Sequence, residues 1–214
     1  MKTQNDNPGK SEKTARNRRD EIIAACERLY HERSFRDISI KDIGAATTFT
    51  RTSIYNYFKT KEEIFLALLT REYRQWAEQI AHIGAKGTLP VTAFARELAA
   101  TFEDRGLMLK LLSMNLYDME SNSRTEQLVA FKLSYKAALQ AVDTCLAGNF
   151  PFMPEYGRQD FIYAFFPFIF GIYPYTSATG KQLAAMAAAG VDHVPMTPHK
   201  LVENCILQLL QHYV

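Results

Sequence analysis

The sequence predicts an all-α fold, and three observations support this. Apolar residues recur three and four positions apart through most of the 214 residues, as they do along the buried face of a helix. No stretch alternates apolar and polar residues over the length of a strand. Gly and Pro residues gather at 84–90 and 148–154, where they end helical patterns. With 47% apolar and 22% charged residues, the chain can bury a sizeable core in one or two domains.

The chain begins with a polar segment that contains Pro8 and Gly9. Its composition predicts a disordered tail over residues 1–15 and no signal peptide. A first helix follows and ends near Arg33, with a buried stripe at Ile22, Ile23, Cys26, Leu29 and Tyr30. Basic residues including Arg18 open this helix, and such a run is usually a solvated face.

Two short helical patterns follow between residues 39 and 58. Ser39 can cap the first, because its hydroxyl can accept a bond from an early helix amide. Residues 47–49 interrupt the pattern, and Thr50 is the second cap candidate. In the second pattern Ile54 and Phe58 lie one turn apart on one face, so we expect both to be buried.

The opposite face of the second short helix is polar. Counting helical steps from Thr52 places Tyr55, Asn56 and Lys59 with it. Small polar and amide side chains read base edges, whereas hydroxyl and ammonium groups hold phosphates. The alternative is an ordinary three-helix fragment whose polar face meets only water; the two caps and the aromatic ending of the helix favour a DNA-reading helix.

The run Tyr55-Asn56-Tyr57-Phe58-Lys59-Thr60-Lys61 resembles the end of the recognition helix in the TetR/AcrR family of transcriptional regulators. The resemblance extends from about Arg18 to Leu69, roughly a quarter of the chain. That family usually has Gly in the turn, where this chain has Thr48, so the turn is either remodelled or strained. The resemblance implies a DNA-binding set of Arg18, Ser39, Thr50, Arg51, Thr52, Ser53, Tyr55, Asn56, Tyr57, Lys59 and Lys61.

The charge distribution agrees with a DNA-binding N-terminal region. Residues 1–61 hold 13 Lys or Arg against 8 Asp or Glu, a net charge of +5, whereas the rest of the chain has a net charge of −3. The positive part therefore contains the candidate reading helix, as attraction to phosphates requires.

A long helix is predicted from Lys61 to about Ile83. Thr60 and Glu63 form a capping-box pattern at its start, and its apolar side carries Ile64, Phe65, Leu68, Leu69, Tyr73, Trp76 and Ile80. It would link the two domains mechanically. Further helical patterns follow over 91–102, 107–117 and 128–146; the third carries a stripe of Phe131, Leu133, Tyr135, Leu139 and Val142.

Residues 161–175 are almost entirely apolar, which raises the question of a membrane span. The strongly apolar part is about 15 residues, short of the ~20 that a spanning helix needs, and Pro167 and Gly171 interrupt it. We therefore expect a buried, kinked helix and no membrane association. An Ala-rich helix over 182–189 and a last helix from Pro198, with an apolar stripe typical of a helix-bundle dimer, complete the chain.

The family resemblance implies that the last two long helices of each subunit form a homodimer interface and that the middle helices enclose a small-molecule pocket. We accordingly divide the chain into a DNA-binding domain, 16–60, and an effector-binding and dimerisation domain, 61–214. Aromatic and Met side chains on the middle helices are the pocket candidates: Phe102, Met108, Leu112, Tyr117, Phe131, Tyr135, Phe165 and Phe168. An aromatic stripe is more often ordinary core, so most of them are expected to pack internally.

The leading hypothesis is a homodimeric repressor that binds double-stranded operator DNA and is released by a small apolar or aromatic effector. The alternative is an adaptor of the same fold controlled by a protein partner. An α-helical enzyme or lipid-handling protein is a third reading, but the sequence holds no nucleophile elbow, phosphate-binding glycine loop or metal-ligand spacing, so we predict no enzyme, cofactor or metal. Three widely spaced cysteines indicate a reduced, cytoplasmic setting.

Overall fold

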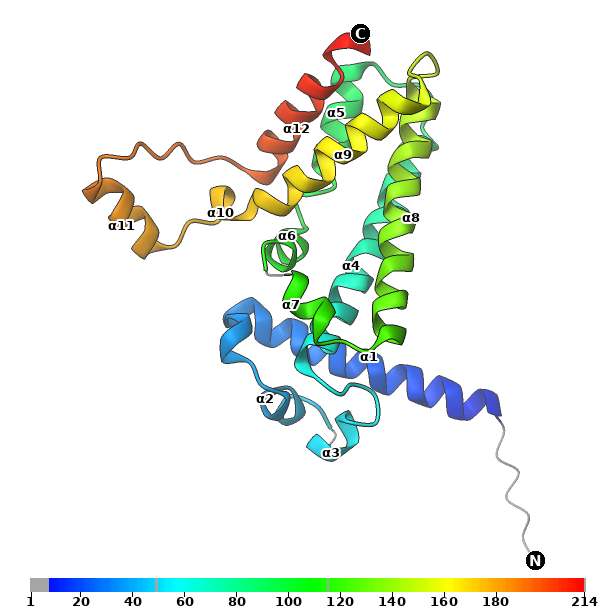
Figure 1. Ribbon diagram of the computed structural model, residues 1–214, viewed down its shortest axis with the longest axis vertical. Coiled ribbons are helices and arrows are strands. Elements are labelled where there is room, and N and C mark those ends of the chain that lie inside the picture. Colours follow the sequence, from blue (N-terminus) through cyan, green and yellow to red (C-terminus); the bar gives the residue numbers. More distant parts are fainter. Residues whose placement is uncertain (1–7, 49, 115, 214) are drawn as a thin grey trace, which may run out of the picture. The chain divides into compact units, whose positions relative to one another are not determined.

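The computed structural model describes residues 8–48, 50–114 and 116–213, and no strand occurs in these ranges. The prediction of an all-α fold is confirmed (Figure 1). The helices follow in the order α1 (Pro8–Glu32), α2 (Ile40–Ala45), α3 (Arg51–Ile54), α4 (Lys61–Gly84), α5 (Val91–Ala100), α6 (Gly106–Leu112), α7 (Leu116–Ser121), α8 (Thr125–Asn149), α9 (Glu155–Gly171), α10 (Tyr173–Thr176), α11 (Gly180–Ala188) and α12 (Pro198–Leu209), with 3-10 turns η1 (Phe35–Asp37) and η2 (Gln211–Tyr213).

The first helix starts earlier than the sequence analysis expected. α1 begins at Pro8 and so includes residues 8–15, which the sequence analysis assigned to the tail; residues 1–7 lie outside the described ranges. Pro favours the first helical position because its fixed φ suits a helix and its missing amide would have had no partner there.

The chain divides into two compact units. Unit 1 covers the described chain up to Leu68 together with Tyr117–Phe131, and unit 2 covers Leu69–Leu116 and Lys132 onward. This division differs from the boundary at residue 60 that the sequence suggested, because the start of α4 and the segment Tyr117–Phe131 pack with the N-terminal helices. α4 and α8 each contribute to both units as uninterrupted helices.

The core of unit 1 forms where the inward faces of its helices meet. The side chains of Ile22, Ile43 and Ile54 are fully buried there. Tyr30 meets Phe65 edge-on, with ring centroids 5.1 Å apart. The predicted buried positions of the first helix and of the short helices therefore pack together, which fixes the direction of the polar face of α3.

The core of unit 2 is centred on Trp76 of α4. Its ring lies 5.1 Å from that of Phe102 and 5.6 Å from that of Phe166, and its indole N–H donates to Thr101 Oγ1 at 2.9 Å. α5 packs beside α12 at one end of the unit (Figure 1). All seven predicted apolar positions of the long helix are fully buried, as expected.

Two details differ from the predicted helices of the second half. In α8, Leu133 is 61% exposed, and the buried face runs instead through Phe131, Ser134, Ala138 and Val142. The apolar helix α9 begins at Glu155, contains Pro167 and ends at Gly171, where α10 continues separately. Within the described ranges, no helix has both the length and the apolar character to cross a bilayer.

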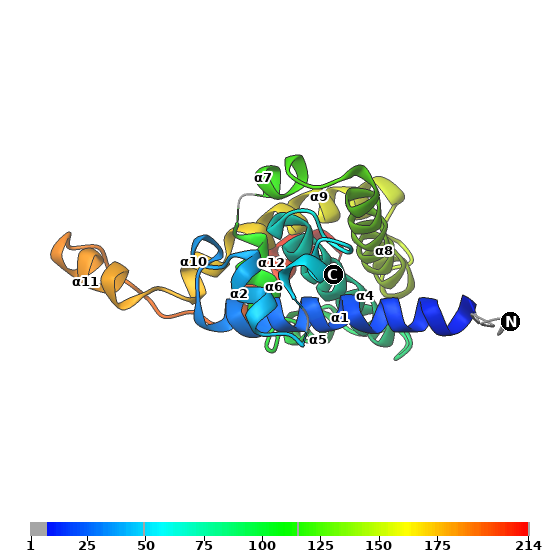
Figure 2. The same ribbon diagram turned by 90° about the horizontal axis from the view of Figure 1, so that it is seen from below.

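The Ala-rich helix α11 buries no residue and is set apart from the other helices of unit 2 in both views (Figures 1 and 2). Its ends are well defined: Thr179 and Gln182 form a capping box, and Gly190, at φ +67°, follows the last turn. α11 is therefore specified by its own sequence rather than by packing within its unit.

Candidate functional site

The turn between α2 and α3 is remodelled rather than strained. No described residue other than glycine has a positive φ, Thr48 included. The Thr48 amide and hydroxyl both donate to Glu21 Oε1, each at 2.9 Å. A carboxylate from α1 thus holds the turn in place of a left-handed glycine.

Both predicted caps are confirmed. The Ser39 hydroxyl accepts from the Asp42 amide and the Asp42 carboxylate accepts from the Ser39 amide, a complete capping box. Hydrogen bonds from Ser39, aided by Arg33, lower the pKa of Asp42. At α3, the Thr50 hydroxyl accepts from the Ser53 amide. Ser39, Thr50 and Ser53 therefore act first as caps that fix the two short helices.

The helix predicted to read DNA, which is α3 with the turns that follow it and is called the reading helix below, is shorter than expected but keeps its two faces. Regular helix ends at Ile54, and helical turns continue to Phe58 through bonds from the Tyr57 and Phe58 amides to the Ile54 carbonyl. Ile54 and Phe58 are fully buried, as expected. Thr52, Asn56 and Lys59 are exposed, and Tyr55 and Tyr57 are half-buried; the Arg51 side chain lies outside the described part of the structure.

The two lysines that follow the reading helix have different surroundings. Lys61 is half-buried, and its ammonium donates to the carbonyls of Phe35 and Ile38 at 2.8 and 3.2 Å and lies 4.1 Å from the Phe35 ring centroid. It braces α4 against η1, so it is a poor candidate for the predicted phosphate contact. Lys59 is exposed and donates to the Tyr55 carbonyl at 2.6 Å.

The basic residues in the middle of α1 also differ from one another. Arg18 is exposed, where it could meet a phosphate. Arg19 is half-buried instead: its guanidinium donates to Gln127 Oε1 at 2.7 Å and lies 5.1 Å from the Phe58 ring centroid. Arg19 therefore joins the base of the reading helix to the start of α8.

A cluster around Glu63 was missed by the sequence analysis, which assigned this residue only to a capping box. The Thr60 half of that box is present, since Thr60 Oγ1 accepts from the Glu63 amide at 3.2 Å. Its carboxylate, however, accepts from the Lys59 amide at 2.7 Å and from Arg124 at its amide, Nε and Nη2, at 3.0, 2.7 and 2.9 Å. Arg124 Nη2 also donates to the Tyr57 carbonyl at 3.1 Å.

The electrostatics of this cluster favour the charged form of Glu63. Its side chain is fully buried, and burial by itself raises its pKa, but the Arg124 guanidinium and the amides of Lys59 and Arg124 outweigh that effect and lower the pKa below its usual value. The same pairing raises the pKa of Arg124. Only the 61-residue separation hid this pair from sequence reasoning.

Most of the predicted pocket residues are core. Phe102, Met108, Phe131 and Phe165 are fully buried, Leu112 is 2% exposed and Phe168 is half-buried. Tyr117 is 87% exposed, so its prediction as a pocket residue is corrected: it stands outside the packed interior. Tyr135 is half-buried and does line a groove described below.

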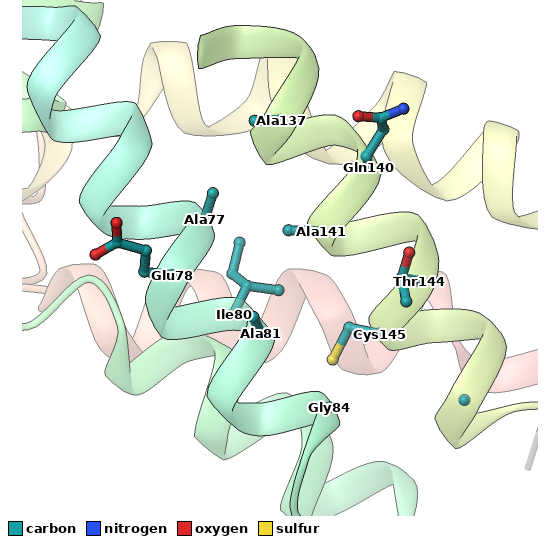
Figure 3. Close-up of a pocket in the computed structure, with 11 residues that line it drawn as sticks. Ala77, Glu78, Ile80, Ala81, Gly84, Ala137, Gln140, Ala141, Thr144 and Cys145 are labelled. Atoms are coloured by element: carbon teal, nitrogen blue, oxygen red, sulfur yellow. The ribbon is translucent and has the colours of Figure 1, made fainter.

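One groove of about 610 Å³ lies between α4 and α8 (Figure 3). Small side chains dominate its walls, and Ile80 and Cys145 lie deeper; the lining is Ala77, Glu78, Ile80, Ala81, Gly84, Ala137, Gln140, Ala141, Thr144, Cys145 and Gly148. Burial raises the pKa of the Cys145 thiol to about 11, so this thiol is uncharged at neutral pH. Such a groove suits a slender apolar molecule.

A second groove of about 420 Å³ lies between α8 and α9. Tyr135, Tyr163 and Phe166 provide aromatic surface, and Asp143, Glu155 and Gln159 provide polar groups. Arg158 donates to Asp143 Oδ1 at 2.7 Å, so that carboxylate is already paired. Among the described residues, no group of His, Cys, Asp and Glu side chains could hold a metal ion.

Comparison with known sequences agrees with the two-part organisation. Residues 22–68 match the family described as bacterial regulatory proteins, tetR family, and residues 70–211 match the family described as tetracyclin repressor-like, C-terminal domain. A curated relative, an uncharacterised HTH-type transcriptional regulator YuxN of Bacillus subtilis strain 168, is 26% identical over 83 residues, which is 39% of this chain. The match spans 28% of that relative's length.

Solved structures share the fold over nearly the whole chain. A putative TetR-family transcriptional regulator from Mesorhizobium loti MAFF303099 aligns with a TM-score of 0.62 at 13% identity, covering 92% of this chain and 96% of its own. A TetR/AcrR-family regulator from Thermobifida fusca YX-ER1 aligns with a TM-score of 0.60 at 18% identity, covering 92% and 99%.

The sequence matches rest on the capped helices and anchored reading helix of unit 1 and on almost all of the chain that follows. They bear out the resemblance drawn from residues 55–61. This chain belongs to the TetR family of transcriptional regulators, which bind DNA and are not enzymes.

Proposed function

We propose that the protein is a cytoplasmic, homodimeric repressor that binds a pseudo-palindromic operator through α3 and is released by a small apolar effector. The observation that carries the DNA-binding part is the reading helix itself. Ile54 and Phe58 anchor it in the core, while Thr52, Asn56 and Lys59 stand exposed on a region of net positive charge. Asn is suited to bidentate contact with adenine, and Lys to contact with phosphate.

The dimer would form through α9 and α12, the last two long helices. α9 carries exposed Tyr163, Ala164 and Pro167 on one side, and its opposite side is buried in unit 2. An exposed aromatic and apolar helix face of this kind is typical of a protein interface. Two copies related by a two-fold axis would present two reading helices to successive major grooves, roughly 34 Å apart.

The effector would occupy the groove between α4 and α8. Its lining is largely apolar, and α4 begins at Lys61, directly after the reading helix. An effector that binds more tightly to a conformation with a different spacing of the reading helices would release the DNA, to an extent set by its differential affinity. The two grooves of unit 2 favour a small effector over the alternative of an adaptor controlled by a protein partner.

The experiment that tests this proposal is selection of bound sequences from random duplex DNA by the purified protein, followed by a salt titration on the selected duplex. We expect an inverted repeat and a steep fall of affinity with salt, because several phosphate contacts release counterions. Failure of a folded sample to enrich any sequence would contradict the assignment of α3 as a reading helix.

A further inference from the structure

The segment that joins α7 to α8 forms hydrogen bonds with the end of the reading helix and with the residues that start α4. We call residues 122–124 the α7–α8 link. The Asn122 carbonyl accepts from Thr60 Oγ1 at 2.9 Å, just before α4. Arg124 donates to the Glu63 carboxylate in the first turn of α4 and to the Tyr57 carbonyl at the end of the reading helix.

Arg124 is the residue that makes this attachment specific. Its guanidinium places Nε and Nη2 on the two Glu63 oxygens, at 2.7 and 2.9 Å, while Nη2 also reaches the Tyr57 carbonyl. A planar guanidinium can hold such a fork, whereas an ammonium group is a point donor. Since Glu63 is fully buried, loss of Arg124 would leave a buried carboxylate without its counter-charge.

The link also connects the reading helix to the grooves along one helix. Arg124 directly precedes α8, which runs without interruption from Thr125 to Asn149. Ala137, Ala141 and Cys145 of α8 line the groove against α4, and Tyr135 and Leu139 line the groove against α9. A rotation or shift of α8 by an occupant of either groove would therefore act on the residue that holds Tyr57 and Glu63.

We propose that Arg124 is a positioning residue for DNA reading: it sets the end of the reading helix through Tyr57 and Glu63, and α8 controls operator affinity through it. The inference rests on the proposed function, because it needs a DNA-reading α3. Arg124 lies outside residues 22–68, which match the tetR-family DNA-binding region, and within residues 70–211, which match the C-terminal domain.

The test compares full-length variants on the inverted-repeat duplex that the wild type selects. Arg124→Ala removes the fork, and Arg124→Lys keeps the positive charge beside Glu63 but cannot reproduce the fork. Lys86→Ala is the control, since it also removes the basic partner of a carboxylate: Lys86 Nζ donates to Glu97 Oε2 at 2.8 Å within unit 2, outside the lining of both grooves. Each variant is measured for dissociation constant at several salt concentrations and for its thermal unfolding midpoint.

We expect Arg124→Ala to weaken operator binding by about tenfold or more, within the usual range of coupling between sites, and Arg124→Lys to lie between it and the wild type. The slope of log affinity against log salt should stay unchanged, because no phosphate contact is lost. Lys86→Ala should bind like the wild type. If Arg124→Ala does not fold, Arg124→Lys provides the test. Weaker operator binding by this variant than by the wild type, at an unchanged unfolding midpoint, would support the proposal.

Two results would overturn the proposal. Arg124 variants that bind as tightly as Lys86→Ala would show that the link does not position the reading helix. A salt slope reduced by about one would make Arg124 a phosphate contact instead. A wild type that selects no duplex would refute the proposed function itself, which is a separate outcome.

Discussion

Arg124 Nε donates to Glu63 Oε1 at 2.7 Å across a separation of 61 residues. The two residues differ in exposure: the Glu63 side chain is fully buried, whereas that of Arg124 is 41% exposed. The buried carboxylate is satisfied by the Lys59 amide as well as by Arg124. Glu63 is thus the point where the end of the reading helix, the start of α4 and the α7–α8 link are held together.

The lowered pKa of Glu63 predicts a specific loss of stability in acid. A group whose pKa is lower in the folded state than its ordinary value of 4.5 stabilises the fold fully above that value, and the contribution is lost as pH falls through the folded-state pKa. Protonation would remove the charge that Arg124 faces; Glu126 is a further charge near that guanidinium. We therefore expect the unfolding midpoint to fall steeply below pH 4.5.

Thermal unfolding of the wild type and of Glu63→Gln between pH 7 and pH 3 measures this effect. The variant should be less stable than the wild type at pH 7, and the gap should narrow in acid because Gln does not titrate. Glu32→Gln, at an exposed position on α1, is the control and should follow the wild type. A constant gap across the whole range would mean that the charge of Glu63 does not stabilise the fold.

The sequence predicted those features of unit 1 that depend on neighbouring residues. Ser39 and Thr50 cap their helices because the amides they accept from lie three positions away, at Asp42 and Ser53. Ile54 and Phe58 are buried because helical spacing fixes their common face. The role of Glu63 was only partly predicted, since its strongest partner lies far along the chain and no local pattern could indicate it.

The lining of the groove proposed for the effector was predicted less well, for a physical reason. Aromatic side chains such as Phe102 and Phe165 are large enough to fill the interior, and they do so around Trp76. The space between α4 and α8 is left open where the facing side chains are small, as at Ala77 and Ala141. Which small residues face each other depends on helix packing, which sequence periodicity does not specify.

Exposed side chains of the reading helix should divide into sequence-reading and phosphate-holding groups. Asn56→Ala should change which duplexes are enriched, because loss of a bidentate base contact costs about 1–3 kcal/mol at one position only. Lys59→Ala should weaken binding to all duplexes alike and reduce the salt slope by about one. Sequence selection and salt titration on both variants separate these effects, with exposed Lys41→Ala on α2 for comparison. Identical selection profiles for Asn56→Ala and the wild type would remove Asn56 from the reading set.

The exposed face of α9 predicts that a charge there breaks the dimer. Tyr163 is 79% exposed, and Tyr163→Asp would place a carboxylate in the proposed apolar interface, where its desolvation opposes association. Sedimentation velocity should show dimers for the wild type and monomers for the variant at micromolar concentration. Leu133→Asp is the control, because Leu133 is an exposed apolar residue of α8 outside the α9 and α12 faces. Dimers of unchanged stability in Tyr163→Asp would exclude α9 from the interface.

The groove between α4 and α8 predicts that added bulk blocks effector binding without loss of the fold. Ala141 lines a space of about 610 Å³, so Ala141→Phe can direct its ring into the groove instead of displacing packed atoms. Its unfolding midpoint should stay close to that of the wild type, while an uncharged apolar fluorescent probe, N-phenyl-1-naphthylamine, should bind much more weakly. Ala184→Phe on exposed α11 adds the same ring outside the lining of both described grooves and should leave groove binding intact. Equal probe binding by the wild type and Ala141→Phe would place the apolar site elsewhere. The groove between α8 and α9, which Tyr135 and Phe166 line, would then be the next site to block by substitution.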